Sequence, residues 1–210
     1  MSKVFVGAFG GAGTRIVMEC LSLAGMYVAE DRSNDMYDYR NTGFVRAFDK
    51  YYLGKKTPFQ TSKLKKIFDE VCAVEESYAL KHGHIMYIPQ ELREAYPGCK
   101  LIYMMRNPID CALKKEYVPH ITYGGKKNAT LDQKIEYYIK ESIRAQEEFD
   151  FVIRLEDLVN NPKEELQRLF EFVGLPLTCL DEAASRIKRS STIGEGKDLY
   201  DSYDMSALGY

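Results

Sequence analysis

The chain has 210 residues, 45% of them hydrophobic, which is the size and composition of one globular domain with its own core. Its formal net charge is −2, whereas a general nucleic-acid binder is strongly basic, so we expect no nucleic-acid partner. Its five cysteines lack the paired spacing of metal ligands, which argues against a disulfide framework or a zinc site. The apolar run at the N-terminus is too short for a signal peptide or a membrane span, so we expect a soluble, cytoplasmic protein with no membrane partner.

The first thirty residues predict a strand, a glycine loop and a helix. A short apolar run follows Lys3, and one helical face then carries apolar residues from Ile16 to Ala24. Glycines in the loop let the backbone turn sharply and approach a ligand, while the first helical turn offers unpaired N–H groups and a positive dipole end. The sequence therefore predicts an anion site formed by Gly10, Gly11, Ala12, Gly13, Thr14 and Arg15.

The loop differs from two common nucleotide motifs. The Lys-Ser/Thr pair that ends an ATP-type phosphate loop is replaced by Thr14-Arg15. The Gly-x-Gly-x-x-Gly fingerprint of dinucleotide sites is also a poor fit. A purely structural glycine turn remains an alternative interpretation of the loop alone.

The next elements are less regular. Residues 26–61 show no strong pattern, and a helix is then expected from Ser62 to near Glu76. Tyr78–Lys81 is a plausible short strand, and Pro89 opens a helix that reaches Tyr96 before Pro97-Gly98 stops it.

A continuous apolar run from Cys99 to Arg106 is typical of a central parallel strand, whose carboxyl end places Arg106 where ligands bind. Asn107-Pro108 opens the next segment, with Asp110 in its first turn. The remaining predicted elements are a helix from about Asp132 to Phe149 with Ile135, Tyr138, Ile139 and Ile143 as its buried stripe, a strand Phe151–Leu155, and a helix from Pro162 to Gly174 with Asn161 as N-cap. This alternation predicts a single α/β domain over residues 1–210, with a mainly parallel central sheet flanked by helices.

Three of these segments together resemble the sulfotransferases that use 3′-phosphoadenosine 5′-phosphosulfate (PAPS). The loop ending at Arg15 is similar to that family's 5′-phosphosulfate loop, Tyr96–Asp110 to its 3′-phosphate segment, and Ile153–Pro162 with Phe172–Pro176 to its carboxyl-terminal signature. The resemblance implies a fold like that of P-loop nucleotide kinases and transfer of a sulfuryl group to a hydroxyl or amine. It also implies adenosine 3′,5′-bisphosphate as product and no metal.

The resemblance assigns further contacts to PAPS. Arg106 would bind the 3′-phosphate, because its planar fork can bond two oxygens; the alternative is a surface arginine paired with Asp110. Lys114 stands where the family commonly has serine and would bind phosphate as a point charge. Lys188 and Arg189 lie in a late, basic, glycine-containing stretch that resembles the family's 3′-phosphate loop, and a solvated tail is the alternative.

The catalytic cation departs from the family pattern. Gly11 stands where the family often has a basic residue that stabilises charge on the bridging oxygen. Arg15 and Lys81 are the replacements we expect, the latter because Lys81-His-Gly-His84 is similar to a lysine segment of some members.

The base is predicted by likeness to the heparan-sulfate 3-O-sulfotransferases, in which a glutamate follows Gly-Thr-Arg on the first helix. Glu19 matches that spacing and would take the proton of the acceptor hydroxyl, unless it only pairs with Arg15. His84 is the competing base, ahead of His82 and His120.

Two other functions stay open at this stage. One is a P-loop-like small-molecule kinase, although the residues that hold Mg²⁺ in kinases are missing. The other is a nucleotide-binding module without catalysis, suggested by Gly11 and Lys114. The acceptor, a small molecule or a glycan, and the oligomeric state are not specified by the sequence.

Overall fold

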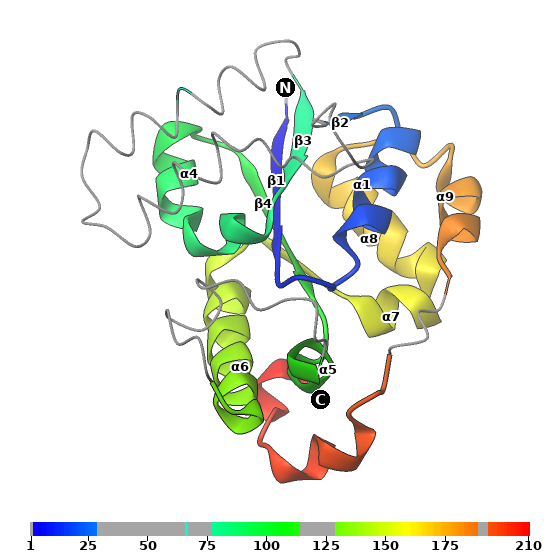
Figure 1. Cartoon of the computed structure of the whole chain (residues 1–210). Coiled ribbons are helices and arrows are strands. Elements are labelled where there is room, and N and C mark those ends of the chain that lie inside the picture. Colours follow the sequence, from blue (N-terminus) through cyan, green and yellow to red (C-terminus); the bar gives the residue numbers. More distant parts are fainter. Residues whose placement is uncertain (1, 29–65, 67–76, 114–128, 189–192) are drawn as a thin grey trace.

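The computed structural model describes residues 2–28, 66, 77–113, 129–188 and 193–210. In these residues five parallel strands form one sheet in the order β2-β3-β1-β4-β5, with helices on both faces (Figure 1). The strands are β1 (Lys3–Ala8), β2 (Tyr27–Val28), β3 (Tyr78–Lys81), β4 (Lys100–Met105) and β5 (Phe151–Arg154). The expected single α/β domain with a parallel sheet is confirmed, and β2 is the strand that the sequence did not predict.

The helices agree with the sequence in part. They are α1 (Thr14–Leu23), α4 (Pro89–Ala95), α5 (Pro108–Leu113), α6 (Leu131–Glu148), α7 (Leu155–Asn160), α8 (Pro162–Val173) and α9 (Leu180–Arg186), with the 3₁₀ turns η1 (Gly83–Tyr87), η2 (Lys197–Ser202) and η3 (Ser206–Leu208). The helices α7 and α9 were not predicted. For α7 the reason is that Leu155 reads as the end of a strand, whereas it begins the helix. The helix expected over residues 62–76 lies outside the described residues, except for Lys66.

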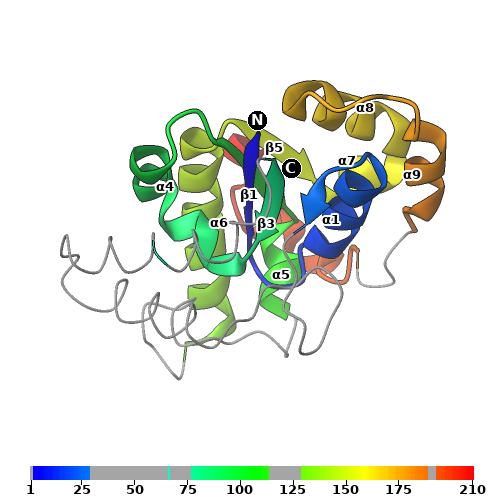
Figure 2. The same cartoon turned by 90° about the horizontal axis from the view of Figure 1, so that it is seen from above.

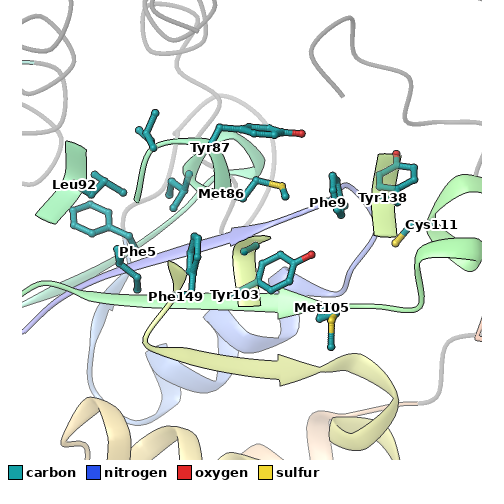
Figure 3. Close-up of a cluster of buried hydrophobic side chains, with 14 of the residues drawn as sticks. Phe5, Phe9, Met86, Tyr87, Leu92, Tyr103, Met105, Cys111, Tyr138 and Phe149 are labelled. Carbon is teal, nitrogen blue, oxygen red and sulfur yellow. The ribbon is translucent and has the colours of Figure 1, made fainter. Parts of the chain in front are cut away.

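The sheet separates two cores. Successive residues of β1 and β4 alternate between them, because side chains of a strand point to opposite faces. One face carries eight buried aromatic side chains, which we call the aromatic core: Phe5, Phe9, Tyr78, Tyr87, Tyr96, Tyr103, Tyr138 and Phe149. Figure 3 shows part of this core, and α4, α5 and α6 cover it. The other face, the aliphatic core, lies under α1, α7, α8 and α9 (Figure 2).

The crossover connections reverse between β1 and β4. The chain leaves β1 for α1 on the aliphatic side, and it leaves β4 for α5 and α6 on the aromatic side. Because β1 and β4 are neighbours, their outgoing loops diverge at the carboxyl edge of the sheet. This edge, at the bottom of Figure 1, is where open α/β sheets bind ligands.

The predicted buried stripe of α6 was partly wrong. Ile135 and Tyr138 are buried, but Ser142 and Ala145 complete the stripe, while Ile139 and Ile143 only pack against its margin. The polar Ser142 is accepted in the core because its hydroxyl lies 2.9 Å from that of Tyr103, so neither group is left unpaired.

The helix α8 begins at Pro162 and ends at Gly174, whose φ of 86° gives the left-handed cap expected of glycine. At the other end Asn161 is the N-cap residue, as predicted, although its side chain makes no capping hydrogen bond. Within the described segments, no helix is long and apolar enough to span a membrane.

Candidate active site

The glycine loop joins β1 to α1 at the carboxyl edge of the sheet. Gly11 and Gly13 have φ values of 81° and 85°, in the left-handed region that favours glycine, whereas Gly10 does not. A Cβ atom at Gly13 would also lie 2.8 Å from Cδ1 of Leu155, the first residue of α7. The loop therefore requires glycine at position 13 for its backbone conformation and for its packing.

The first turn of α1 is suited to an anion. Gly13 is the N-cap, so the N–H groups of Thr14 and Arg15 lie among those that an α-helix cannot pair internally. No acidic side chain stands in this turn, and the exposed Arg15 adds positive charge to the helix dipole. Backbone donors and charge thus agree with the predicted anion site.

Arg106 follows β4 and its side chain is fully buried. Its Nη1 atom donates a hydrogen bond to the carbonyl oxygen of Gly11 at 3.1 Å, and its Nη2 atom lies 3.7 Å from Oδ2 of Asp110. The pairing with Asp110 is therefore real, but it is not the surface ion pair of the alternative interpretation. The structure brings the glycine loop and Arg106, which are far apart in the sequence, into direct contact.

Asp110 is also fully buried, and it accepts hydrogen bonds from the C-terminal part of the chain. The N–H of Gly194 donates to Oδ2 at 2.6 Å, and the N–H of Gly196 and the hydroxyl of Tyr200 donate to Oδ1 at 2.9 and 3.1 Å. Burial, and then the neighbouring Asp110 carboxylate, raise the pKa of Tyr200, so this hydroxyl stays protonated and can donate. In Figure 1 the segment concerned runs below the sheet beside α5.

Asn107 lies next to Arg106 and holds the start of α5. Its side-chain oxygen accepts the N–H of Ile109 at 2.9 Å, and its own N–H donates to Glu156 at 3.0 Å. Its Nδ2 atom is buried with no hydrogen-bond partner among the described residues. A buried amide donor at this place is available to an oxygen-rich ligand.

The last residues of the chain pack beside this point. Arg154 donates to the carbonyl oxygens of Leu208 and Gly209, and its guanidinium lies 5.1 Å from the ring centre of Tyr210. The hydroxyl of Tyr210 donates to Glu156 at 2.8 Å. Residues 208–210 therefore contact the last residue of β5 and the first turn of α7.

Lys81, a predicted catalytic cation, ends β3 and is buried, with 6% of its surface exposed. It is paired in register with Val6 of β1, and the N–H of the next residue, His82, donates to the carbonyl of Val6 at 3.1 Å. Lys81 is therefore the last residue of the strand adjacent to β1, at the same edge of the sheet as the glycine loop. His84 lies in η1, but its side chain is outside the described part of the structure.

Glu19 lies in α1, and 32% of its side chain is exposed. Its Oε1 atom is 3.7 Å from Nη1 of Arg186 at the end of α9. Glu19 therefore has an ion-pair partner on a different helix from the one that the sequence suggested.

The structure describes only some of the other residues that the sequence predicted in the site. Lys188 follows α9 and is exposed. Lys114, Arg189 and His120 lie outside the described residues. The described residues hold no cluster of three or more His, Cys, Asp or Glu side chains that could bind a metal ion.

Sequence reasoning did not find the roles of Asp110, Asn107 and the Gly194–Gly196 turn. Asp110 and the late glycines stand far apart in the sequence, and their hydrogen bonds join residues 84 and 86 positions apart. The residues of such a contact share no local periodicity, so a pattern search along the chain gives no signal for it.

Comparisons with known proteins assign the chain to one family. The model of the sulfotransferase family matches residues 15–179, which is most of the chain, so the chain belongs to the sulfotransferase family. Among curated proteins, none matches the sequence significantly.

Solved sulfotransferase structures share the fold. Sulfotransferase STF9 from Mycobacterium avium is 14% identical with a TM-score of 0.54, and the match covers 97% of this chain and 77% of that one. A sulfotransferase from Alicyclobacillus acidocaldarius is 16% identical with a TM-score of 0.50, over 99% and 94% of the two chains. The sulfotransferase domain of the curacin biosynthetic pathway is 14% identical with a TM-score of 0.50, over 98% and 88%. At these identities the likeness establishes the fold.

Family membership confirms the expected class of reaction. The family transfers a sulfuryl group, its donor is PAPS, and adenosine 3′,5′-bisphosphate is the product. The kinase and the non-catalytic module are therefore not favoured.

Proposed function

We propose that this protein transfers the sulfuryl group of PAPS to a hydroxyl or amine of a small-molecule or glycan acceptor. In this proposal PAPS lies across the carboxyl ends of β1 and β4. The observation that carries the proposal is the 3.1 Å hydrogen bond from Arg106 to the carbonyl of Gly11, because it joins the two predicted anion sites at the point where the crossovers reverse.

The residues present suit the two charged ends of PAPS. The N–H groups of Thr14 and Arg15 and the dipole of α1 suit the 5′-phosphosulfate, whereas the N–H of Ala12 already donates to the carbonyl oxygen of Phe9. The fork of Arg106 suits the 3′-phosphate, and the Nδ2 donor of Asn107 adds a neutral hydrogen bond near it. Lys114, Lys188 and Arg189 are proposed as further phosphate contacts. Holding both ends orients the sulfuryl group toward the acceptor.

PAPS supplies the sulfuryl group, and the chain supplies charge and a proton acceptor. Lys81, at the end of β3, and Arg15, at the start of α1, are proposed to balance negative charge near the transferred group. As the acceptor oxygen bonds to sulfur, the bond from sulfur to the bridging oxygen of PAPS breaks and adenosine 3′,5′-bisphosphate leaves. Glu19 or His84 takes the proton of the acceptor hydroxyl. Glu19 is the first choice, since a helical side chain leans toward the N-terminal end of its helix, where the glycine loop ends.

Calorimetry with nucleotides tests the proposal directly. Adenosine 3′,5′-bisphosphate should bind without Mg²⁺ and at least about tenfold more tightly than ATP, since two separated anion sites match its two phosphates. Tighter binding of ATP, with Mg²⁺ required, would contradict the proposal. Incubation with labelled PAPS and mixtures of sugars, phenols and peptides would then identify the acceptor class.

A further inference from the structure

Resting on the proposed function, we propose that Asp110 is a positioning residue for the 3′-phosphate end of the site. Its carboxylate fixes the guanidinium of Arg106 and the Gly194–Gly196 turn as one unit. A series of polar contacts then connects the carbonyl of Gly11, Arg106, Asp110 and the C-terminal segment.

The carboxylate of Asp110 has a complete set of partners. Three donors from the C-terminal segment and one guanidinium surround it, and the side chains of Asp110 and Arg106 are both fully buried. A buried charge is tolerated only when it is paired and hydrogen-bonded in this way. The arrangement therefore depends on all of its members being present together.

The turn is built to reach Asp110. A Cβ atom at Gly196 would lie 2.4 Å from Cγ2 of Ile109 and 3.1 Å from Cδ1 of Leu113, so only glycine lets the backbone rest directly on α5. Gly194 has a φ of 83°, which also favours glycine. The two glycines place their N–H groups on the two oxygens of one carboxylate.

A positioning role for Asp110 and a purely electrostatic role predict opposite effects on the binding of a 3′-phosphate. If the carboxylate only competed with phosphate for Arg106, its neutralisation would tighten the binding of a 3′-phosphate, because a negative charge 3.7 Å away would be removed. If it holds Arg106 and the turn in place, the same change weakens binding. The sign of the effect therefore separates the two roles.

The test compares Asp110→Asn with wild type by calorimetry. The amide keeps the size of the side chain, but its NH₂ group would face donors that now bind a carboxylate oxygen. Adenosine 3′,5′-bisphosphate should bind about 10- to 100-fold more weakly, while adenosine 5′-phosphosulfate, which lacks the 3′-phosphate, should change by less than about twofold. Tyr200→Phe removes one donor only and should weaken the bisphosphate by about 2- to 10-fold.

Asp204→Asn is the matched control. It makes the same charge change at an exposed carboxylate of the same segment, where Asp204 accepts hydrogen bonds from Ser206. Both nucleotides should bind this variant as they bind wild type. Unchanged or tighter binding of the bisphosphate to Asp110→Asn would overturn the proposal, and so would equal losses for both nucleotides.

Amide hydrogen exchange tests the contact without any nucleotide. The amides of Gly194 and Gly196 should be protected in wild type and in Asp204→Asn, and exchange faster in Asp110→Asn. Equal exchange in all three proteins would overturn the positioning role. If wild type shows this protection but binds neither nucleotide, the proposed function fails while the contact stands.

Discussion

The two halves of the candidate site are built from different parts of the chain. The 5′ half consists of backbone: a glycine loop and the first turn of α1, which are consecutive in the sequence. The 3′ half consists of buried side chains, Arg106, Asn107 and Asp110, completed by a turn from the far end of the chain.

The difference determines what each half can tolerate. Backbone donors persist when side chains change, provided that the left-handed residues stay glycine. A network of buried side chains fails when one member is lost, because the others keep their charge without a partner. Variants should therefore affect the 5′ half through geometry and the 3′ half through charge.

The largest effect is expected at Glu19, on the helix of the 5′ half. Glu19→Gln keeps the size of the side chain but cannot take a proton, so turnover should fall by about 10²- to 10⁴-fold. Affinity for adenosine 3′,5′-bisphosphate should hardly change. Turnover is measured by transfer from labelled PAPS to the acceptor found by screening, and affinity by calorimetry.

Arg186→Gln is the control for Glu19, because it breaks the same ion pair and leaves the carboxylate in place. If Glu19 is the base, the arginine variant keeps most of the turnover. Similar losses of melting temperature and turnover in both variants would assign Glu19 a structural role. Near-normal turnover in Glu19→Gln, with a large loss in His84→Ala, would make the histidine the base.

The next effect tests the 3′ half. Arg106→Ala should weaken the binding of adenosine 3′,5′-bisphosphate by about 1.5–3 kcal/mol, the usual contribution of a hydrogen bond to a charged group. The binding of adenosine 5′-phosphosulfate should barely change. Calorimetry with both nucleotides measures the difference. Equal losses for the two would place Arg106 away from the 3′-phosphate.

Arg106→Lys sharpens this test. Lysine keeps the positive charge beside Asp110 but loses the fork that reaches both the carbonyl of Gly11 and the carboxylate. Its loss of bisphosphate affinity should be smaller than that of the alanine variant. The melting temperature of each variant reports how far the buried carboxylate is left without a cation.

The same contrast explains what the sequence could predict. The strand, loop and helix of the 5′ half are consecutive, so glycine positions and apolar spacing indicate them directly. The position of Arg106 at the carboxyl edge of the sheet was predicted from its place after an apolar strand. The burial of Arg106 and its hydrogen bond to Gly11 depend on the pairing of β1 with β4, which no local pattern encodes. Its ion pair with Asp110 spans only four residues, so the sequence could offer that contact as an alternative.

Errors in the predicted elements have a similar cause. Leu155 continues the apolar pattern of β5, but it turns into α7 and packs beside Gly13, a contact set by the tertiary fold. The C-terminal segment has only short 3₁₀ turns, so it lacks the periodicity that would have indicated structure.

A smaller effect tests the geometry of the 5′ half. Gly13→Ala should lower the free energy of unfolding by about 1–3 kcal/mol, because φ is 85° and the new Cβ would press on Leu155. The same change should weaken the binding of both nucleotides. Gly25→Ala is the matched control, with a φ of 90° and nothing within 4 Å of its Cβ. It should cost about 1 kcal/mol in stability and leave nucleotide binding unchanged. Equal effects of the two variants on nucleotide binding would show that the glycine loop is not part of the binding site.

The smallest effect tests whether α1 is a fixed platform for the loop. Burial, and then the nearby charge of Glu19, raise the pKa of the Cys20 thiol to about 12 from 9.0, so almost no thiolate forms at pH 8. Iodoacetamide should therefore modify the half-buried Cys179 well before Cys20, as measured by mass spectrometry of peptides. Because the folded protein keeps this proton to a higher pH than the unfolded chain, the contribution of Cys20 to stability is full below pH 9 and is lost as the pH rises toward 12. Adenosine 3′,5′-bisphosphate should slow the modification of Cys20 further, since it binds the folded state. Rapid labelling of Cys20 at pH 8 would instead show that α1 separates readily from α9. The backbone N–H groups at the start of α1 would then not be held in place for the ligand.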